Sequence, residues 1–326
     1  MTRQTIVVTV VIAMLCLWMA ASPAAADEPE TGDDFLTAFS DMSDTEAFLE
    51  YSELELLRSQ AVVETQTGEF TDDDRDRMAS LLAALQSFEE AHSHAEAGDR
   101  EAAIEGADEV NDHLSELRDL DGERYAQLGE VALNRFYEVQ AAELYDEAQG
   151  VSETPERIEM QRTAAHAFGE AGASQRYSTL TVESEELESR FESDLDRLEG
   201  DTDDATAFLD GCDETCSELP AAIASGPEAF ERYEEAQTAH AKATAAGSTA
   251  DEHGLTDRQE TLAEVESETF DALVTTAGAS AAIVFGYAAV FLLLSFLLVG
   301  RIARWERDVE SARVPEIVAV QEVTDA

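Results

Sequence analysis

The stretch ALVTTAGASAAIVFGYAAVFLLLSFLLVG, residues 272–300, contains no charged side chain. At ~1.5 Å per residue, a helix over residues 277–299 alone would extend roughly 35 Å. That length is enough to cross a hydrocarbon core of ~30 Å with some tilt. A buried helix of a globular protein is rarely so long and so uniformly apolar, so we predict one C-terminal transmembrane helix at residues 277–299.

The two flanks of this apolar run differ in charge. Residues 264–271 contain four acidic side chains. Positively charged loops remain in the cytoplasm, and tryptophan is common at the membrane interface. We therefore predict a single-pass protein of the cell membrane, with residues 27–271 extracellular and a cytoplasmic tail at 300–326. The residues that set this orientation follow the run directly: Arg301, Arg304, Trp305 and Arg307.

The N-terminus has the features of a secretory signal peptide. Arg3 precedes an apolar run from Ile6 to Ala21, and Ala24 and Ala26 then have the spacing of a cleavage site. We predict that residues 1–26 form a signal peptide and are removed, so that the mature chain begins near Asp27.

Acidic residues dominate the composition. The chain holds 72 Asp and Glu against 20 Lys and Arg, a formal charge of −52, yet 44% of its residues are hydrophobic. That apolar fraction predicts a folded protein with an acidic surface instead of a disordered acidic tail. Lys242 is the only lysine, and this usage resembles that of proteins from halophilic archaea. Nucleic acid is not an expected partner, because phosphate binding needs a basic stripe and none is visible.

Glycines, prolines and capping residues divide residues 27–255 into helices, and almost nothing indicates strands. Ser43 with Glu46 has capping-box spacing at the start of a helix expected over 43–64. Thr71 followed by Asp72, Asp73 and Asp74 is expected to start another helix, because anionic side chains favour the exposed amides of a first turn. A helix is expected over 123–148, and another begins with Pro155 in its first turn. The sequence therefore predicts an all-α ectodomain. Its expected breaks lie at Gly98, 119–122, Gly150, Gly172, Gly200, around Pro220, 225–227 and 247–254.

The stretch ERYAQLGEVALNRFYEVQAAELYDEAQ, residues 123–149, resembles a tetratricopeptide repeat, and the weaker resemblance extends over 85–190. It implies a TPR-like solenoid in which pairs of helices stack, and members of this family generally hold partner proteins. A helical bundle without repeats is the alternative. The match places large and small packing residues on two successive helices: Tyr125, Leu128 and Gly129 on the first, and Ala141, Tyr145 and Ala148 on the second.

No glycine or proline interrupts residues 256–276, so we expect a helical stalk that runs directly into the membrane span. Within the span, Gly278, Ala282 and Gly286 are four residues apart and share one helix face. Small residues on such a face allow close packing of a second helix, so a homodimer through this face is one prediction. Incidental small residues are the alternative.

Cys212 and Cys216 are the only cysteines beyond the predicted signal peptide. An extracellular pair one helical turn apart predicts a disulfide, and two free thiols or a metal pair are the alternatives. His92 and His94 point in different directions on a helix and cannot chelate one ion together, so we expect surface histidines. No phosphate-binding loop, nucleophile elbow or zinc-protease motif occurs. We therefore expect no enzymatic activity, no cofactor and no metal.

These observations favour a protein-protein interaction or scaffold module at the cell envelope, held in the bilayer by one helix and bound to other envelope or membrane proteins. The alternative is an accessory or sensing subunit of a membrane complex that signals through its transmembrane helix. No motif in the sequence identifies the partner.

The acidity also predicts that folding requires concentrated salt. Like charges repel across ~10 Å at ~0.1 M salt but only across ~3 Å at ~1 M. We expect far-UV circular dichroism to lose helical signal when the salt is lowered from molar concentrations to about 0.05 M. An unchanged spectrum at low salt would contradict this expectation.

Overall fold

The structure is a computed structural model that describes residues 31–42, 45–67, 70–212 and 214–313. Across these residues it is 90% helical and contains no strand, which confirms the all-α prediction for this part of the chain. Two compact units form, one from the residues up to Val151 with Pro155–Leu187, and one from Ser152–Thr154 with the residues from Glu188 onward. The predicted signal peptide with Ala24 and Ala26 lies outside the described residues, as does the tail beyond residue 313.

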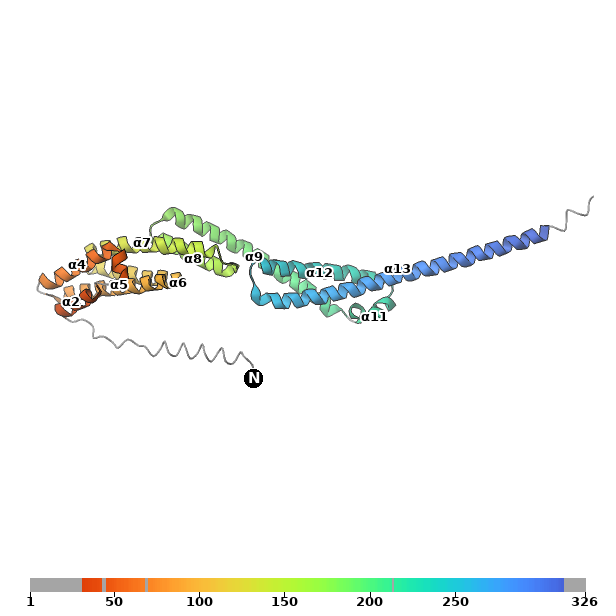
Figure 1. Cartoon of the computed structure of the whole chain (residues 1–326), viewed down its shortest axis with the longest axis horizontal. Coiled ribbons are helices and arrows are strands. Elements are labelled where there is room, and N and C mark those ends of the chain that lie inside the picture. The colour runs from red at the N-terminus through yellow and green to blue at the C-terminus, as the bar shows by residue number, and fades with distance from the viewer. Residues whose placement is uncertain (1–30, 43–44, 68–69, 213, 314–326) are drawn as a thin grey trace, which may run out of the picture. The chain divides into compact units, whose positions relative to one another are not determined.

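Unit 1 contains the N-terminal helices, which pack against their neighbours in sequence (Figure 1). The chain leaves α8 through a turn at Gly172 and enters α9, whose residues up to Leu187 belong to this unit. The helices are α2 (Gly32–Asp41), α3 (Glu46–Glu50), α4 (Ser52–Thr67), α5 (Asp72–Glu96), α6 (Arg100–Asp119), α7 (Glu123–Ala148), α8 (Thr154–Glu170) and α9 (Ser174–Gly211).

Capping boxes fix two helix starts in unit 1. The predicted helix start at Thr71 is confirmed, and a capping box forms there: the Thr71 side chain accepts from the Asp74 amide, and the Asp74 carboxylate accepts from the Thr71 amide. Thr31 and Asp34 form the same arrangement at the start of α2, a helix that the sequence analysis did not predict. Each box satisfies amides that the first helical turn would otherwise leave unpaired.

Aromatic side chains fill the centre of unit 1. The rings of Tyr51 and Phe88 meet edge to face with centroids 5.1 Å apart, and Phe88 lies 5.2 Å from Phe136. Arg135 lies over the Tyr51 ring at 5.2 Å. Burial, the largest cause, and the adjacent Glu50 carboxylate together raise the pKa of Tyr51 to about 12. This cluster joins α5 and α7 to the turn between α3 and α4.

Two expectations for unit 1 are wrong. The predicted helix from Ser43 onward is two helices, because Tyr51 adopts an extended backbone between α3 and α4, and Ser43 itself lies outside the described residues. The six repeat positions do not lie on two helices, since α7 is unbroken and carries all of them. The tetratricopeptide resemblance is therefore not confirmed. These positions are Tyr125, Leu128, Gly129, Ala141, Tyr145 and Ala148.

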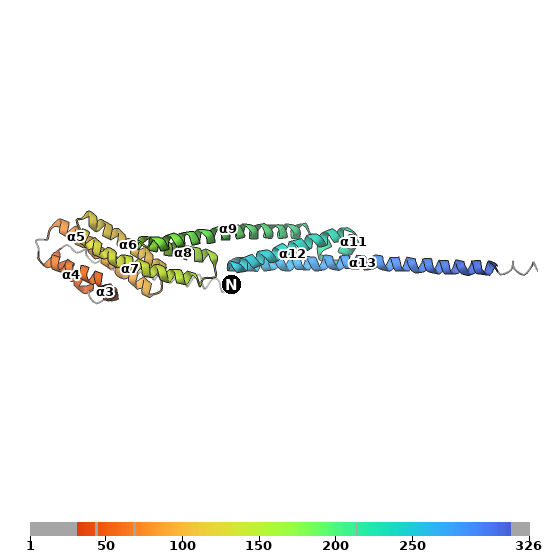
Figure 2. The same ribbon diagram turned by 90° about the horizontal axis from the view of Figure 1, so that it is seen from above.

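Unit 2 consists of the end of α9 and the helices that follow. Figure 2 shows α12 and α13 side by side along most of α12, and they run antiparallel because only residues 253–255 connect them. Beyond this hairpin α13 continues alone. The helices are α10 (Glu214–Ser217), α11 (Leu219–Ala224), α12 (Glu228–Glu252) and α13 (Thr256–Arg313).

Small residues at heptad spacing form the contact between α12 and α13. The buried alanines of α12 recur every three, four or seven residues, so they share one face of the helix. The facing side of α13 is also mostly small or hydroxylated. With such short side chains between them, two helix backbones can approach closely. The alanine seam, as we name it, comprises Ala229, Ala236, Ala239, Ala243, Ala246 and Ala250 on α12 and Leu262, Thr269, Ala272, Thr276, Ala279 and Ile283 on α13.

The turn of the α12–α13 hairpin is held by a buried histidine. His253 is 7% exposed, and its ring nitrogens lie 3.0 Å from Thr154 Oγ1 and 3.2 Å from Asp194 Oδ2. Gly254 follows with a φ of +65°, and a Cβ there would lie 2.8 Å from the Ser152 carbonyl oxygen. Only glycine fits this position without strain. The turn therefore fixes the short segment 152–154 on unit 2.

One predicted break in unit 2 is absent, because helix α9 continues through Gly200. The break predicted over 247–254 lies at the end of that range, since α12 continues to Glu252 and the turn follows at 253–255. A single glycine costs a helix only about 1 kcal/mol relative to alanine, and burial of neighbouring side chains can offset that cost. Leu198 supplies such burial beside Gly200, because it packs on Ala246 and Ala250.

Helix α13 is continuous from Thr256 to Arg313, with no break at the start of the predicted membrane span. Its packing on α12 extends to Ile283, which is 9% exposed. Beyond that residue the large apolar side chains are exposed, and only 6% of the most apolar window is buried. By length and composition, this helix could cross a membrane. The residues predicted as a stalk are thus part of a packed hairpin.

The glycines allow a test of these helix assignments. Gly200→Ala places a Cβ where no atom lies within 4 Å, so we expect it to raise the free energy of unfolding by up to about 1 kcal/mol. Gly129→Ala is the matched substitution on α7, but its Cβ would lie 2.5 Å from Cδ2 of buried Leu114. Overpacking of about 1–3 kcal/mol should outweigh its gain in helix propensity.

Thermal unfolding of both variants, followed by circular dichroism, measures the difference. We expect Tm to rise for Gly200→Ala and to fall for Gly129→Ala. A lower Tm for Gly200→Ala would indicate that α9 does break at this glycine.

Candidate functional site

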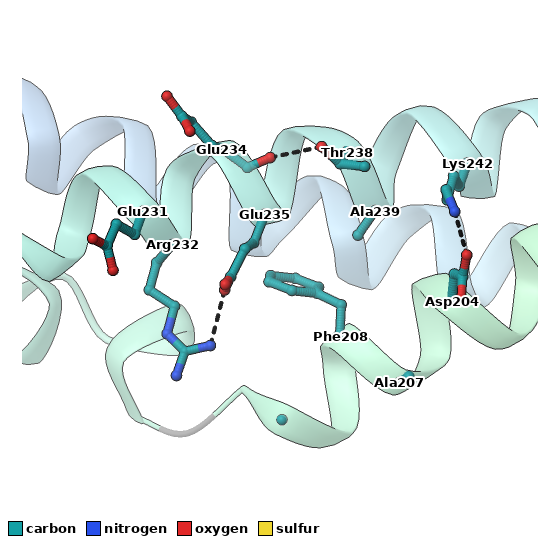
Figure 3. Close-up of a pocket in the computed structure, with 11 residues that line it drawn as sticks. Asp204, Ala207, Phe208, Glu231, Arg232, Glu234, Glu235, Thr238, Ala239 and Lys242 are labelled. Atoms are coloured by element: carbon teal, nitrogen blue, oxygen red, sulfur yellow. Dashed lines mark hydrogen bonds and ion pairs between the residues drawn. The ribbon is translucent and has the colours of Figure 1, made fainter.

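A groove of about 700 Å³ lies within unit 2, between the C-terminal part of α9 and the N-terminal half of α12 (Figure 3). Both walls are helical, so the positions of the lining side chains are set by regular backbone. The residues that line it are Asp204, Ala207, Phe208, Gly211, Glu231, Arg232, Glu234, Glu235, Thr238, Ala239 and Lys242.

The groove has an aromatic centre. Phe208 extends from α9 towards α12, and Figure 3 shows its ring between Glu235 and Ala239. Ala239 is a seam residue, so the same helix position that packs on α13 also borders the groove. The small Ala207 and Ala239 side chains leave the Phe208 ring accessible. An incoming apolar side chain could therefore bury surface against Phe208, with a favourable free energy of roughly 25 cal/mol per Å².

Both cations at the rim already have anionic partners. Arg232 Nη1 donates to Glu235 Oε2 at 3.0 Å, and the Lys242 ammonium donates to the Asp204 carboxylate. That hydrogen bond to Asp204 is the main reason why the pKa of Lys242 is raised. Glu231 and Glu234 are exposed and add two further carboxylates to the rim. The rim is therefore net acidic, and it favours a cationic partner.

A second hollow of about 490 Å³ lies in unit 1 between α7, α8 and the start of α9. Arg176 lies over the Phe168 ring at 5.2 Å and donates to Glu138 at 3.2 Å. The Tyr145 hydroxyl donates to Glu183 at 3.4 Å, and burial followed by the Glu183 charge raises the pKa of this tyrosine. Tyr145, expected as a repeat packing residue, thus lies at the edge of a surface hollow.

A tyrosine, an aspartate and a histidine form a hydrogen-bonded group in unit 1. Such residues occur in catalytic sites, but the tyrosine of this group is buried. The Tyr137 hydroxyl donates to Asp108 Oδ1 at 2.5 Å, and His166 Nε2 lies 3.1 Å from Asp108 Oδ2. Burial and the Asp108 carboxylate raise the pKa of Tyr137. Tyr137 is 1% exposed, so a substrate cannot reach its hydroxyl. The arrangement joins α6, α7 and α8.

Cys212 and Cys216 lie at the end of unit 2 where α9 leads into α10 and α11. Their Sγ atoms are at bonding distance, 2.25 Å, and their Cα atoms are 5.5 Å apart. The pair therefore has the spacing of the predicted disulfide. Among the described residues no three His, Cys, Asp or Glu side chains are arranged as ligands of a metal ion.

The histidines predicted at the surface differ from each other. His92 is 6% exposed, its Nε2 lies 3.1 Å from Glu50 Oε2, and its ring packs edge to face on Tyr51. The expectation of a surface position is therefore wrong for His92. His94 is partly exposed and points elsewhere on α5.

The predicted transmembrane packing residues separate into two groups. A Cβ on Gly278 would lie 3.4 Å from Leu219 Cδ1, so this glycine faces α11 of the same chain. Ala282 is exposed, and no atom lies within 4 Å of a Cβ on Gly286. A partner helix could therefore reach only the latter two. The predicted orientation residues are all exposed on α13, namely Arg301, Arg304, Trp305 and Arg307.

Nothing in the local sequence groups Phe208 with the acidic side chains around it. They lie on two helices that are separated by α10 and α11, so no local spacing joins them. One signal was present in the sequence: alanines recur every seven residues at Ala229, Ala236, Ala243 and Ala250. That repeat would have identified the packed face of α12 and, by exclusion, its free face.

Comparisons of this chain with protein-family models, with curated proteins and with solved structures find no match.

Proposed function

We propose that this chain is a single-pass membrane protein whose helical N-terminal part lies outside the cell and binds other proteins of the envelope. The observation that carries the proposal is the change from buried to exposed side chains along α13 at Ile283. The helix packs on α12 up to that residue, and beyond it exposes large apolar side chains from Val284 to Val299. So large an exposed apolar surface needs an apolar partner, and a bilayer supplies one on all sides of a single helix.

Charge supports the proposed orientation. Three arginines and Trp305 follow the apolar segment on the same helix, whereas Glu264, Glu268 and Asp271 precede it. Excess arginine marks the cytoplasmic end of a membrane span. The N-terminal signal peptide, which remains a prediction, would export the same part of the chain.

The groove beside Phe208 supports a binding role. A partner segment with one apolar side chain between Lys or Arg residues would complement its aromatic centre and its acidic rim. The opposite charges would also speed the encounter, because complementary potentials raise association rates. This role requires no cofactor and no catalytic group.

An accessory or sensing subunit is the second candidate, and the continuity of α13 favours it. One unbroken helix from Thr256 to Arg313 would connect a binding event outside to the cytoplasmic side. Deletion of residues 301–326 separates the two functions. A scaffold keeps its partner and its activity without the tail, whereas a signalling subunit keeps the partner but loses the response.

Photo-crosslinking on intact cells tests the interaction module. A benzophenone amino acid at Thr238 lies in the groove, and the same residue at Gln237 is the matched control, exposed on α12 but outside the groove. We expect a discrete crosslinked species from Thr238 and none from Gln237. Phe208→Ala should abolish it, and Glu231→Gln with Glu234→Gln should weaken it, because these changes remove the apolar anchor and the acidic rim.

Two results would overturn the proposal. Equal capture from Thr238 and Gln237, or capture that Phe208→Ala leaves unchanged, would show that the groove does not select the partner. A crosslinked species that protease added to intact cells cannot digest, but that is digested after lysis, would contradict the extracellular position.

A further inference from the structure

The apolar part of α13 that projects free of unit 2 is short. Packing holds the helix up to Ile283, and the uncharged run ends at Gly300. At ~1.5 Å per residue this free segment spans about 25 Å. A hydrocarbon core measures ~30 Å, so about 5 Å of it remains unmatched. The difference corresponds to three or four residues of helix, which places the outer boundary of the hydrocarbon near residue 280.

Other elements of unit 2 contact α13 at that same height. The Ser280 hydroxyl donates to the Ala229 carbonyl at 3.2 Å, which places the first turn of α12 beside residue 280. Leu219 of α11 lies next to Gly278. Ala222 and Ala229 share a small core with Ala279 and Ile283. If the boundary lies near residue 280, these two elements meet the bilayer as well.

These elements expose three large apolar side chains. Leu219 is 46% exposed, Ile223 39% and Phe230 40%. Residues 219–227, LPAAIASGP, contain no charged side chain in a chain with 72 Asp and Glu. Exposed apolar side chains gathered at one end of an otherwise acidic domain are typical of an interaction surface. Glu218 and Glu228 lie at the two ends of this segment, and their charges limit how deeply it could enter.

We propose that α11 and the first turn of α12, residues 219–230, form a lipid-binding collar around α13. The collar inserts Leu219, Ile223 and Phe230 into the interfacial layer of the outer leaflet. It rests on the proposed membrane anchoring, and it adds a second, lateral contact with lipid to that of the span. Side chains at this depth supply the apolar surface that the short free segment of α13 lacks. The collar would also restrain the tilt of unit 2 against the bilayer.

Tryptophan fluorescence in vesicles tests this collar. The full chain carries two tryptophans, Trp18 and Trp305. With both replaced by phenylalanine, a single new tryptophan reports its own surroundings. Ile223→Trp probes the collar, Val290→Trp probes the span, and Thr261→Trp is exposed on α13 at the far end of the hairpin, about 30 Å from residue 280. The protein is reconstituted into phosphatidylcholine vesicles with and without bromine on the acyl chains.

We expect brominated lipid to quench Val290→Trp strongly, Ile223→Trp to an intermediate extent, and Thr261→Trp hardly at all. Emission of Ile223→Trp should also shift to shorter wavelength on reconstitution. The collar is overturned if Val290→Trp is quenched while Ile223→Trp matches Thr261→Trp. It is also overturned if Ile223→Trp shifts to the blue without quenching, which would indicate a protein contact. If Val290→Trp itself is not quenched, the membrane anchoring and therefore the proposed function fail.

Discussion

The close antiparallel packing of α12 on α13 is the constraint on which the rest of unit 2 depends. The seam is built from alanines on α12 and mostly from small or hydroxylated side chains on α13, so the distance between the two backbones tolerates little added volume. Its register fixes where α13 leaves the protein, because Ala229 at the start of α12 meets Ser280. The same register presents the free face of α12 to α9 and so creates the groove beside Phe208.

Unit 1 is stabilised differently. Large aromatic and aliphatic side chains fill its core, and some of its few cations pair with two carboxylates, as Arg77 does with Glu64 and Asp74. Hydrogen bonds from Thr71, and then the charge of Arg77, lower the pKa of Asp74. This carboxylate therefore stabilises the fold at neutral pH, and its contribution disappears as the pH falls through the lowered pKa. Glu101 shows the opposite, since burial and the nearby Glu159 raise its pKa. So much negative charge favours folding only where cations or salt offset it.

Local chemistry allowed part of this fold to be predicted. Capping at Thr71, the turn at 119–122 and the ends of α7 were all predictable, because each depends on residues that are adjacent in sequence. Gly200 was misjudged as a break, since the side chain that offsets its cost packs on a helix far along the chain. The packed face of α13 does not follow its hydrophobic residues either. Phe270 and Val274 are 51% and 53% exposed, while Thr269 and Thr276 are buried. Hydrophobicity alone does not predict the packed face of a helix where small side chains, and not the most apolar ones, are buried.

The most direct test of the alanine seam is hydrogen exchange in two variants of α12. Ala243 is 1% exposed in the seam, and Ala241 is exposed two residues away. Leucine at either position keeps a good helix propensity. The account predicts that Ala243→Leu speeds amide exchange throughout α12 and the packed part of α13, whereas Ala241→Leu leaves it unchanged. Equal exchange in the two variants would contradict the close packing from which the groove, the exit of α13 and the collar all follow.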